Sequence, residues 1–104
     1  MGLDINIESR SDKDIMEWNF NGRRKWGDFI VYMEHEFDYK CAENMPLTKP
    51  IIDKMIDDLI YNCKEIDAEE NYFDLVDKVQ MIEALLYCRS AINNGGEATW
   101  EADW

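Results

Sequence analysis

Carboxylates are the most abundant side chains able to do chemistry in this chain, which has 23 Asp and Glu residues and a single histidine among 104 residues. Two carboxylates can act as general acid and base, but carboxylate pairs carry little information in so acidic a sequence. His35 lies between Glu34 and Glu36. Neighbouring helix positions point about 100° apart, so these three side chains do not converge on one metal ion. We therefore predict no catalytic residue, no metal ligand and no cofactor.

The motifs that identify common enzyme sites are missing from the sequence. It contains no G-x-S-x-G, no H-E-x-x-H, no P-loop and no Rossmann glycine set. We expect a protein that is not an enzyme. The alternative is a small enzyme or nucleotide-binding domain with an unrecognised site around His35 or Arg23.

The only basic cluster is Arg23, Arg24 and Lys25, which directly precedes Trp26. Cations in the first turn of a helix oppose the helix dipole. Two interpretations follow from this arrangement. Either the three cations pair with acids of the same molecule, or they contact a phosphate or an acidic patch of a partner.

Two tryptophans four residues apart, Trp100 and Trp104, stand among acids at the end of the chain, after Gly95 and Gly96. Tryptophan is enriched among the residues that dominate protein–protein interfaces. Either Trp100 folds back onto the rest of the chain, or the segment binds a groove of a partner. We expect one small globular domain over residues 1–96 and an acidic-aromatic tail over residues 97–104.

Two short alternating segments predict strands at the start of the chain. Leu3, Ile5 and Ile7 alternate with polar residues, and a second alternation follows a polar turn over residues 9–14. Helical spacing then predicts helices over residues 23–38, from the N-cap Thr48 to about residue 66, and over residues 72–93, with residues 44–47 as a loop and 67–71 as an acidic connection. The fold class is α+β: an N-terminal two-stranded antiparallel hairpin packed on about three helices, mostly helical.

The predicted buried faces of the last two helices follow from three- and four-residue steps. In the first of them the inward residues are Ile52, Met55, Ile56, Leu59, Cys63 and Ile66. In the second the inward residues are Leu75, Val76, Val79, Met81, Ile82, Leu85, Leu86, Cys88 and Ile92.

The cysteines and the hydropathy pattern indicate a compartment. Cys41, Cys63 and Cys88 show neither a C-x-x-C pair nor the spacing of a zinc site, and unpaired thiols are typical of a reducing environment. No apolar run approaches the roughly 18 residues that a membrane span needs. We expect a cytoplasmic protein.

The formal net charge of −12 is unevenly distributed along the chain. Residues 1–25 contain five acids and five bases, so residues 26–104 carry the whole excess. The acidity either serves only to keep the protein soluble or attracts a cationic partner. It argues against duplex DNA and anionic membranes as ligands, because both are negatively charged. The acids that we expect to contact a partner lie on the second helix and the connection after it: Asp53, Asp57, Asp58, Glu65, Asp67, Glu69 and Glu70.

The opening residues 1–4, MGLD, and the aromatic and basic stretch from Trp18 to Trp26 resemble a group of small phage, prophage and bacterial proteins. Residues 72–75 are similar to the later aromatic-acidic helix of these proteins. The resemblance implies a phage-type origin and no particular activity, and a phage-encoded protein would be in the host cytoplasm.

These observations favour an acidic interaction protein of the phage inhibitor or adaptor type. It would bind a basic, nucleic-acid-binding surface of a host protein, such as a defence nuclease or a polymerase, by mimicking nucleic acid. The alternative is a homodimer or a subunit of a complex that uses Trp100 and Trp104 as anchors. Arg23, Arg24 and Lys25 are further candidate contacts in either case.

Overall fold

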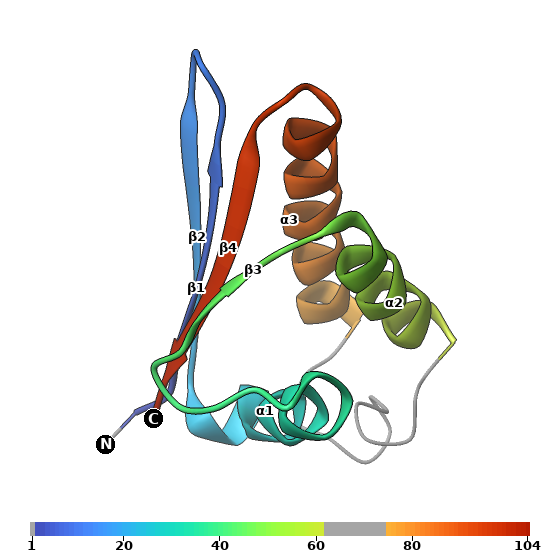
Figure 1. Cartoon of the computed structure of the whole chain (residues 1–104). Helices are drawn as coiled ribbons and strands as arrows, with labels where there is room; N and C mark the ends of the chain where they lie inside the picture. The colour runs from blue at the N-terminus through green and yellow to red at the C-terminus, as the bar shows by residue number, and fades with distance from the viewer. Residues whose placement is uncertain (1, 62–74) are drawn as a thin grey trace.

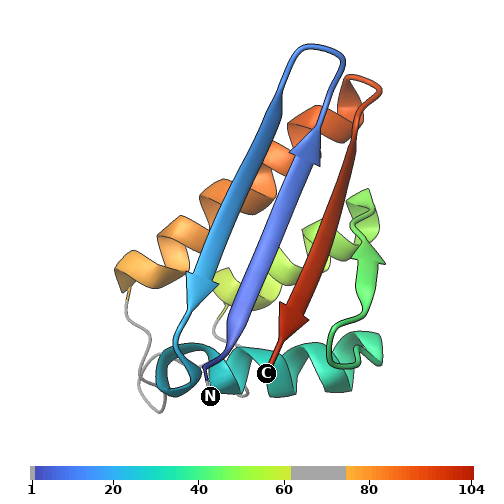
Figure 2. The same ribbon diagram turned by 90° about the vertical axis from the view of Figure 1, so that its left-hand side faces the viewer.

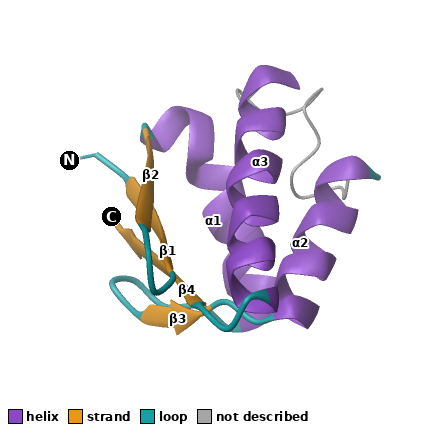
Figure 3. Cartoon of the chain, turned by 90° about the horizontal axis from the view of Figure 1, so that it is seen from above, coloured by secondary structure: helices purple, strands orange, loops and turns teal. Residues whose placement is uncertain are grey.

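The computed structural model describes residues 2–61 and 75–104, which form one antiparallel sheet and a layer of helices. The strands are β1 (Asp4–Arg10), β2 (Ile15–Asn21), β3 (Asn44–Pro46) and β4 (Glu97–Asp103). The helices are α1 (Arg23–Phe37), α2 (Lys49–Ile60) and α3 (Leu75–Asn93). The strand order is β2-β1-β4-β3, and all three helices lie on the same side of the sheet (Figures 1 and 3). The opposite side of the sheet is open (Figure 2).

The hairpin of β1 and β2 forms as the alternating pattern predicts. Leu3, Ile5 and Ile7 are buried, and the strands pair antiparallel from Asp4 opposite Asn21 to Arg10 opposite Ile15. A tight turn joins them, in which the Ser11 N–H donates to the Asp14 carbonyl at 2.9 Å.

The predicted two-stranded hairpin is wrong as a description of the sheet, which has four strands. Residues 97–103, which we set apart as a tail, form β4 and pair with β1 along its whole length. This pairing joins the two ends of the chain, so no local periodicity reveals it. The inward residues Ala98 and Ala102 are also poor strand formers, which hides the pattern in the sequence.

The second missed strand is β3, within the predicted loop over residues 44–47. It is only three residues long and contains Pro46, two features that are typical of loops. Its pairing with β4 holds it in the sheet, and hydrogen bonds from Ala42 to Ala102 and from Leu47 to Ala98 extend the contact at both ends.

The boundaries of α1 and the start of α2 agree with the prediction. The Thr48 side chain caps α2 by accepting a hydrogen bond from the Ile51 N–H, and Pro50 lies in the first turn. At the end of α1, Asp38 takes a left-handed conformation with φ of 52°. The predicted continuation of the second helix through Cys63 and Ile66 and the start of the third over residues 72–74 lie outside the described residues.

The predicted buried face of α3 is partly wrong. Met81, Leu85 and Cys88 are fully buried, but Leu75 is 71% exposed and Val76 62%. Val79 and Leu86 are also exposed, whereas Ala84, Asp77 and Lys78 are buried. Apolar residues occur on every side of α3, so the periodicity of its own sequence does not define one buried face. Packing against the sheet and α2 determines which face of α3 is buried.

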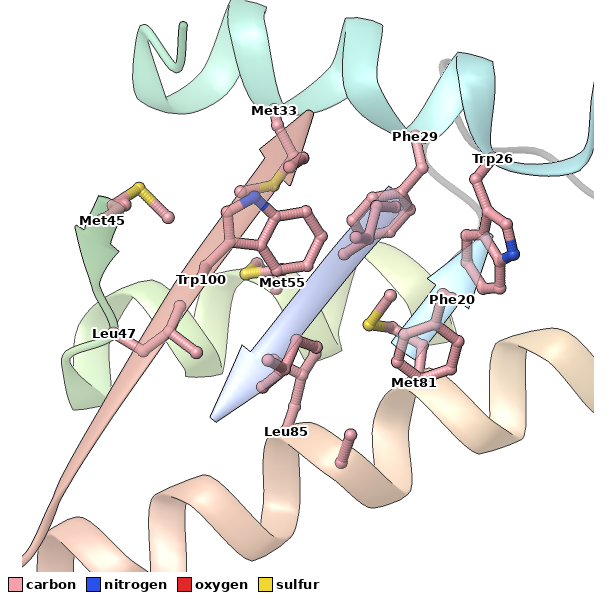
Figure 4. Packing of buried hydrophobic residues seen from close by; sticks show 14 of the residues in the cluster. Phe20, Trp26, Phe29, Met33, Met45, Leu47, Met55, Met81, Leu85 and Trp100 are labelled. Carbon is pink, nitrogen blue, oxygen red and sulfur yellow. The ribbon is translucent and has the colours of Figure 1, made fainter. Parts of the chain in front are cut away.

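The core lies between the sheet and the helices. Figure 4 shows Trp100 projecting from β4 among Phe29 and Met33 of α1 and Met55 of α2. The Trp100 and Phe29 ring centroids are 5.7 Å apart. The core therefore fixes the inner face of the sheet and leaves its outer face to solvent.

Candidate functional site

The side of the sheet opposite the helices collects the outward residues of all four strands, and we call it the open sheet face. Side chains alternate between the two faces of a strand, so burial of one set exposes the other. Except for Ile15 and Pro46, all members of the open sheet face are polar or charged. They are Asp4, Asn6, Glu8, Arg10, Ile15, Glu17, Asn19, Asn21, Asn44, Pro46, Glu97, Thr99, Glu101 and Asp103.

Carboxylates dominate the charge of this face, with six acids and one arginine. Arg10 donates a hydrogen bond to Glu8, and this bond raises the pKa of the guanidinium. Arg10 also stands opposite Glu97 of β4. Arg10 therefore interacts with Glu8, Glu97 and Glu17 at one end of the face, while Asp4, Glu101 and Asp103 lie nearer the other end.

Two pairs of acids stand directly opposite each other across neighbouring strands. Glu8 of β1 faces Glu17 of β2, and Asp4 of β1 faces Asp103 of β4. Like charges at directly opposed positions destabilise a sheet. A face selected only for solubility is better built from interspersed charges of both signs.

Three asparagines form a chain of hydrogen bonds across β1 and β2 on this face. The Asn21 Nδ2 donates to the Asn19 Oδ1 at 2.8 Å, and the Asn19 Nδ2 donates to the Asn6 Oδ1 at 2.6 Å. This chain of amides orients side chains that would otherwise turn freely in solvent. Each amide has both donor and acceptor groups, so the face can bind polar groups beyond simple cations.

A hollow of about 380 Å³ lies over β1, β3 and β4 on the same face. Small and medium polar side chains line most of it, together with carboxylates: Asn6, Glu8, Arg10, Asn44, Glu97, Ala98, Thr99 and Glu101. Carboxylates accept two parallel hydrogen bonds from a guanidinium and also bind an ammonium group. The hollow is therefore chemically suited to arginine or lysine side chains.

The acids predicted on α2 are in a different environment. Asp53 accepts a hydrogen bond from Arg89 Nε at 2.7 Å. Asp58 accepts hydrogen bonds from the Tyr32 hydroxyl and from Lys54 Nζ, and the bond to Lys54 raises the pKa of the lysine. Asp57 is exposed. Two of these three acids thus contribute to contacts within the molecule.

The other predicted acids, Glu65, Asp67, Glu69 and Glu70, lie outside the described residues. The structure therefore places neither their side chains nor the acidic connection that contains them.

The basic cluster begins α1, beyond the end of β2. Lys25 Nζ is 3.2 Å from Asp77 Oδ1 of α3, which agrees with pairing inside the molecule. Arg24 is exposed and also has an interaction partner. Arg23 is the first residue of the helix, and its side chain is outside the described part.

The two C-terminal tryptophans do not form a free anchor. Trp100 is 0% exposed, so it cannot contact a partner without unfolding of the core. Trp104 is partly buried against the core, and its ring centroid is 6.2 Å from that of Tyr39. The backbone N–H of Trp104 donates to Cys41 Sγ. The burial of Trp100 agrees with the alternative in which this side chain folds back onto the rest of the chain, and it does not support Trp100 as an interface anchor.

The open sheet face was missed as a site because half of its acids come from β4. The outward acids of β1 and β2 are visible in the alternation, but Glu97, Glu101 and Asp103 belong to the predicted tail. The alternation of Ala98, Trp100 and Ala102 with polar residues was the one local indication of a strand there.

The chain has no detectable similarity to a protein-family model, a curated protein or a solved structure. Across residues 2–61 and 75–104, no three or more His, Cys, Asp or Glu side chains gather closely enough to hold a metal ion. No helix of the described part is both long and apolar enough to cross a membrane.

Proposed function

We propose that this protein is a non-enzymatic interaction protein that binds a basic surface of another protein through its open sheet face. The observation that carries the proposal is the pair of like-charge contacts, Glu8 opposite Glu17 and Asp4 opposite Asp103. Both contacts cost stability, and a bound cationic surface removes that cost by placing positive charge between the acids.

The chemistry of the face specifies the partner. Arginine and lysine side chains fit the carboxylates and amides of the hollow around Glu101 and Asn44. Proteins that bind nucleic acid present such cations in rows that contact phosphates. We therefore favour a nucleic-acid-binding partner, such as a nuclease or polymerase, which the acidic face occupies in place of nucleic acid.

The resemblance to small phage proteins and the expected cytoplasmic location are both part of this proposal. A phage-type inhibitor or adaptor meets its partner in the host cytoplasm, where free thiols such as Cys41 persist. Charge complementarity would accelerate that encounter and exclude acidic partners.

The rival surface is α2, where Asp57 is exposed and Asp53 pairs with Arg89. The two surfaces differ in the ion pairs that a partner must displace. On α2 it must displace an existing ion pair to reach Asp53. On the open sheet face, Asp4, Glu101 and Asp103 form no ion pair with the described part of the chain, whereas Glu8, Glu17 and Glu97 interact with Arg10.

The direct test is nuclear magnetic resonance with an arginine-rich peptide of about ten residues as the probe. We expect shifts in the amide resonances around Glu8, Glu97 and Glu101 and not along α2, with weaker binding as salt is raised from about 50 to about 300 mM. Shifts that spread evenly over all acidic surfaces, or that follow Asp57, would contradict the proposal.

A matched pair of charge reversals gives the second test. Glu101→Lys changes the centre of the open sheet face, and Glu34→Lys makes the same charge change on the exposed side of α1. We expect Glu101→Lys to abolish capture of basic proteins from a bacterial lysate at low salt, and Glu34→Lys to preserve it. Equal losses in both variants would show that net charge alone is responsible.

A further inference from the structure

The two edges of the sheet differ in how they are protected. The β3 edge is three residues long, and Pro46 removes an N–H from it. The β2 edge is seven residues long and contains neither proline nor lysine. Natural proteins shorten or charge an edge strand, or interrupt it with proline, to prevent pairing with another chain. The contrast between the two edges indicates that β2 is the edge available to pair with a strand of another chain.

The hydrogen-bond pattern shows which groups of β2 are available. The Asp14 N–H donates to Ser11 and the Gly22 N–H donates to Leu3, so even-numbered positions of this segment direct their backbone groups toward β1. The backbone groups of Ile15, Glu17, Asn19 and Asn21 therefore point away from the sheet. In the described part of the chain, no backbone hydrogen bond beyond the sheet uses them.

We propose that β2 of a second copy of this chain pairs antiparallel with β2, about a two-fold axis at Trp18. The two sheets then become one continuous sheet of eight strands. In this register Glu17 stands opposite Asn19 of the second copy, and Ile15 stands opposite Asn21. Trp18 stands opposite its own equivalent, and Met16 opposite Phe20.

The choice of register follows from charge and overlap. Only odd-numbered residues of β2 direct their backbone groups outward. Hydrogen bonds between two copies therefore require that odd-numbered residues stand opposite odd-numbered residues, and each alternative register shifts one strand by two residues. The neighbouring register on one side places Glu17 opposite Glu17, which is unfavourable. The neighbouring register on the other side places Ile15 beyond the partner strand, opposite Arg23 of α1. The register centred on Trp18 avoids both costs and pairs all seven residues.

The sequence of β2 fits its own copy on the inner face as well. Met16, Trp18 and Phe20 are the inward residues and lie symmetrically about Trp18. Met16 is 36% exposed and Trp18 is half-buried, although their neighbours in the sheet are buried. Trp18 also makes an edge-on contact with Tyr87 of α3, whose ring is partly exposed. A second strand would cover this apolar margin, which is why we assign the edge to a second copy.

This inference is independent of the proposed function and responds oppositely to salt. Two chains of charge −12 repel each other, so screening by salt should strengthen the dimer. Binding of a basic partner should weaken under the same conditions. A dimer would also join two open sheet faces into one longer acidic surface.

Sedimentation equilibrium of the full chain tests the dimer, with variants at Asn19. Asn19→Pro removes an N–H that the monomer does not use, so the fold should persist in circular dichroism while the dimer is lost. Asn19→Lys creates two symmetric contacts with Glu17 and should tighten the dimer roughly 2- to 30-fold, and Asn19→Asp should weaken it by a similar factor.

The matched controls are Asn44→Lys and Asn44→Asp, which make the same charge changes on the open sheet face at the opposite edge. We expect both to leave the dimer constant nearly unchanged. A wild-type chain that stays monomeric at about 1 mM would overturn the inference. Dimerisation of Asn19→Pro would also overturn the inference. Equal effects of the Asn19 and Asn44 variants on the dimer constant would overturn it as well. If the proline variant does not fold, the opposite effects expected for Asn19→Lys and Asn19→Asp test the inference.

Discussion

Glu8 of β1 and Glu17 of β2 stand directly opposite each other on the open sheet face. Arg10 binds Glu8 from the next outward position of the same strand, whereas Glu17 has only Ile15 and Asn19 as its outward neighbours on β2. The repulsion between the two carboxylates is therefore only partly relieved. The same two carboxylates therefore lower the stability of the hairpin and belong to the surface that we propose binds a partner.

Replacing Glu17 by glutamine should stabilise the protein. The substitution removes one charge of an opposed pair while keeping the shape of the side chain, so the free energy of unfolding should rise by about 0.2–1 kcal/mol. The gain should shrink as salt screens the repulsion. Urea denaturation at low and high ionic strength measures both effects.

The control for this prediction is Glu34→Gln, which makes the same charge change on α1 without an opposed strand residue. An equal gain from both variants would mean that the total negative charge, and not the Glu8–Glu17 contact, limits stability.

Truncating the Trp100 side chain should destabilise the fold severely. Trp100 is fully buried and contacts Phe29 and Tyr39, so Trp100→Ala should cost about 3–5 kcal/mol in the free energy of unfolding. Trp104→Ala should cost less, because Trp104 lies at the margin of the core. Thermal melting monitored by circular dichroism compares the two variants.

Removal of residues 97–104 is the stricter form of the same test. It deletes β4, which lies between β1 and β3 and supplies the Trp100 side chain, so the shortened chain should not fold. A cooperative melting transition in a chain of residues 1–96 would show that this segment is dispensable after all.

Loss of Asp77 should weaken the contact between α1 and α3. Asp77 is buried, lies in the first turn of α3 and pairs with Lys25 at 3.2 Å. Asp77→Ala removes this ion pair and a favourable charge at the helix N-terminus, at a cost of about 1–3 kcal/mol in the free energy of unfolding. Chemical denaturation measures the change.

The comparison variant on the same helix is Glu83→Ala, whose side chain is exposed. We expect a change within about 0.5 kcal/mol for it. Similar losses at Asp77 and Glu83 would argue that helix propensity, rather than the ion pair with Lys25, accounts for the effect.

The thiols should differ sharply in reactivity. Burial raises the pKa of Cys88 to about 12, while Cys41 is exposed. In a Cys63→Ser background, Ellman's reagent at about pH 8 should modify one thiol in the native protein and two after denaturation. Cys41→Ser should remove the fast reaction. Rapid labelling of Cys88 in the native state would contradict its buried position.

The raised pKa of Cys88 also predicts a pH dependence of stability. The unfolded thiol loses its proton near its ordinary pKa of about 8.5, whereas the folded thiol keeps it until about pH 12. The unfolded state therefore binds fewer protons in this window, and the free energy of unfolding should fall as pH rises, by up to about 1.4 kcal/mol per pH unit. A Cys88→Ala variant should lack this component when unfolding is measured between pH 8 and pH 10.

Local patterns in the sequence were sufficient for part of the fold. The alternation of Leu3, Ile5 and Ile7 identified β1, because burial of one face requires a period of two. Thr48 identified the start of α2, because its side chain satisfies a backbone N–H next to it in the chain. In both cases the interacting groups are close in sequence.

The tertiary structure alone decided where the acids gather. Residues 1–25 have no net charge, yet the structure separates Asp4, Glu8 and Glu17 on the sheet from Lys25 on α1. It then adds the acids of β4 beside them through pairing with β1. Net charge along a chain therefore did not predict the charge of a surface.

The same distinction explains α3 and the tail. A helix with apolar residues on every side has no periodicity that selects a buried face, so contact with the sheet buried Leu85 and left Leu75 in solvent. Residues 97–103 become a strand because β1 offers them hydrogen-bonding partners more than eighty residues away in sequence. The sequence by itself determined the elements whose stabilising contacts are local. Only the tertiary structure determined which faces meet solvent, because long-range strand pairing and helix packing decide that.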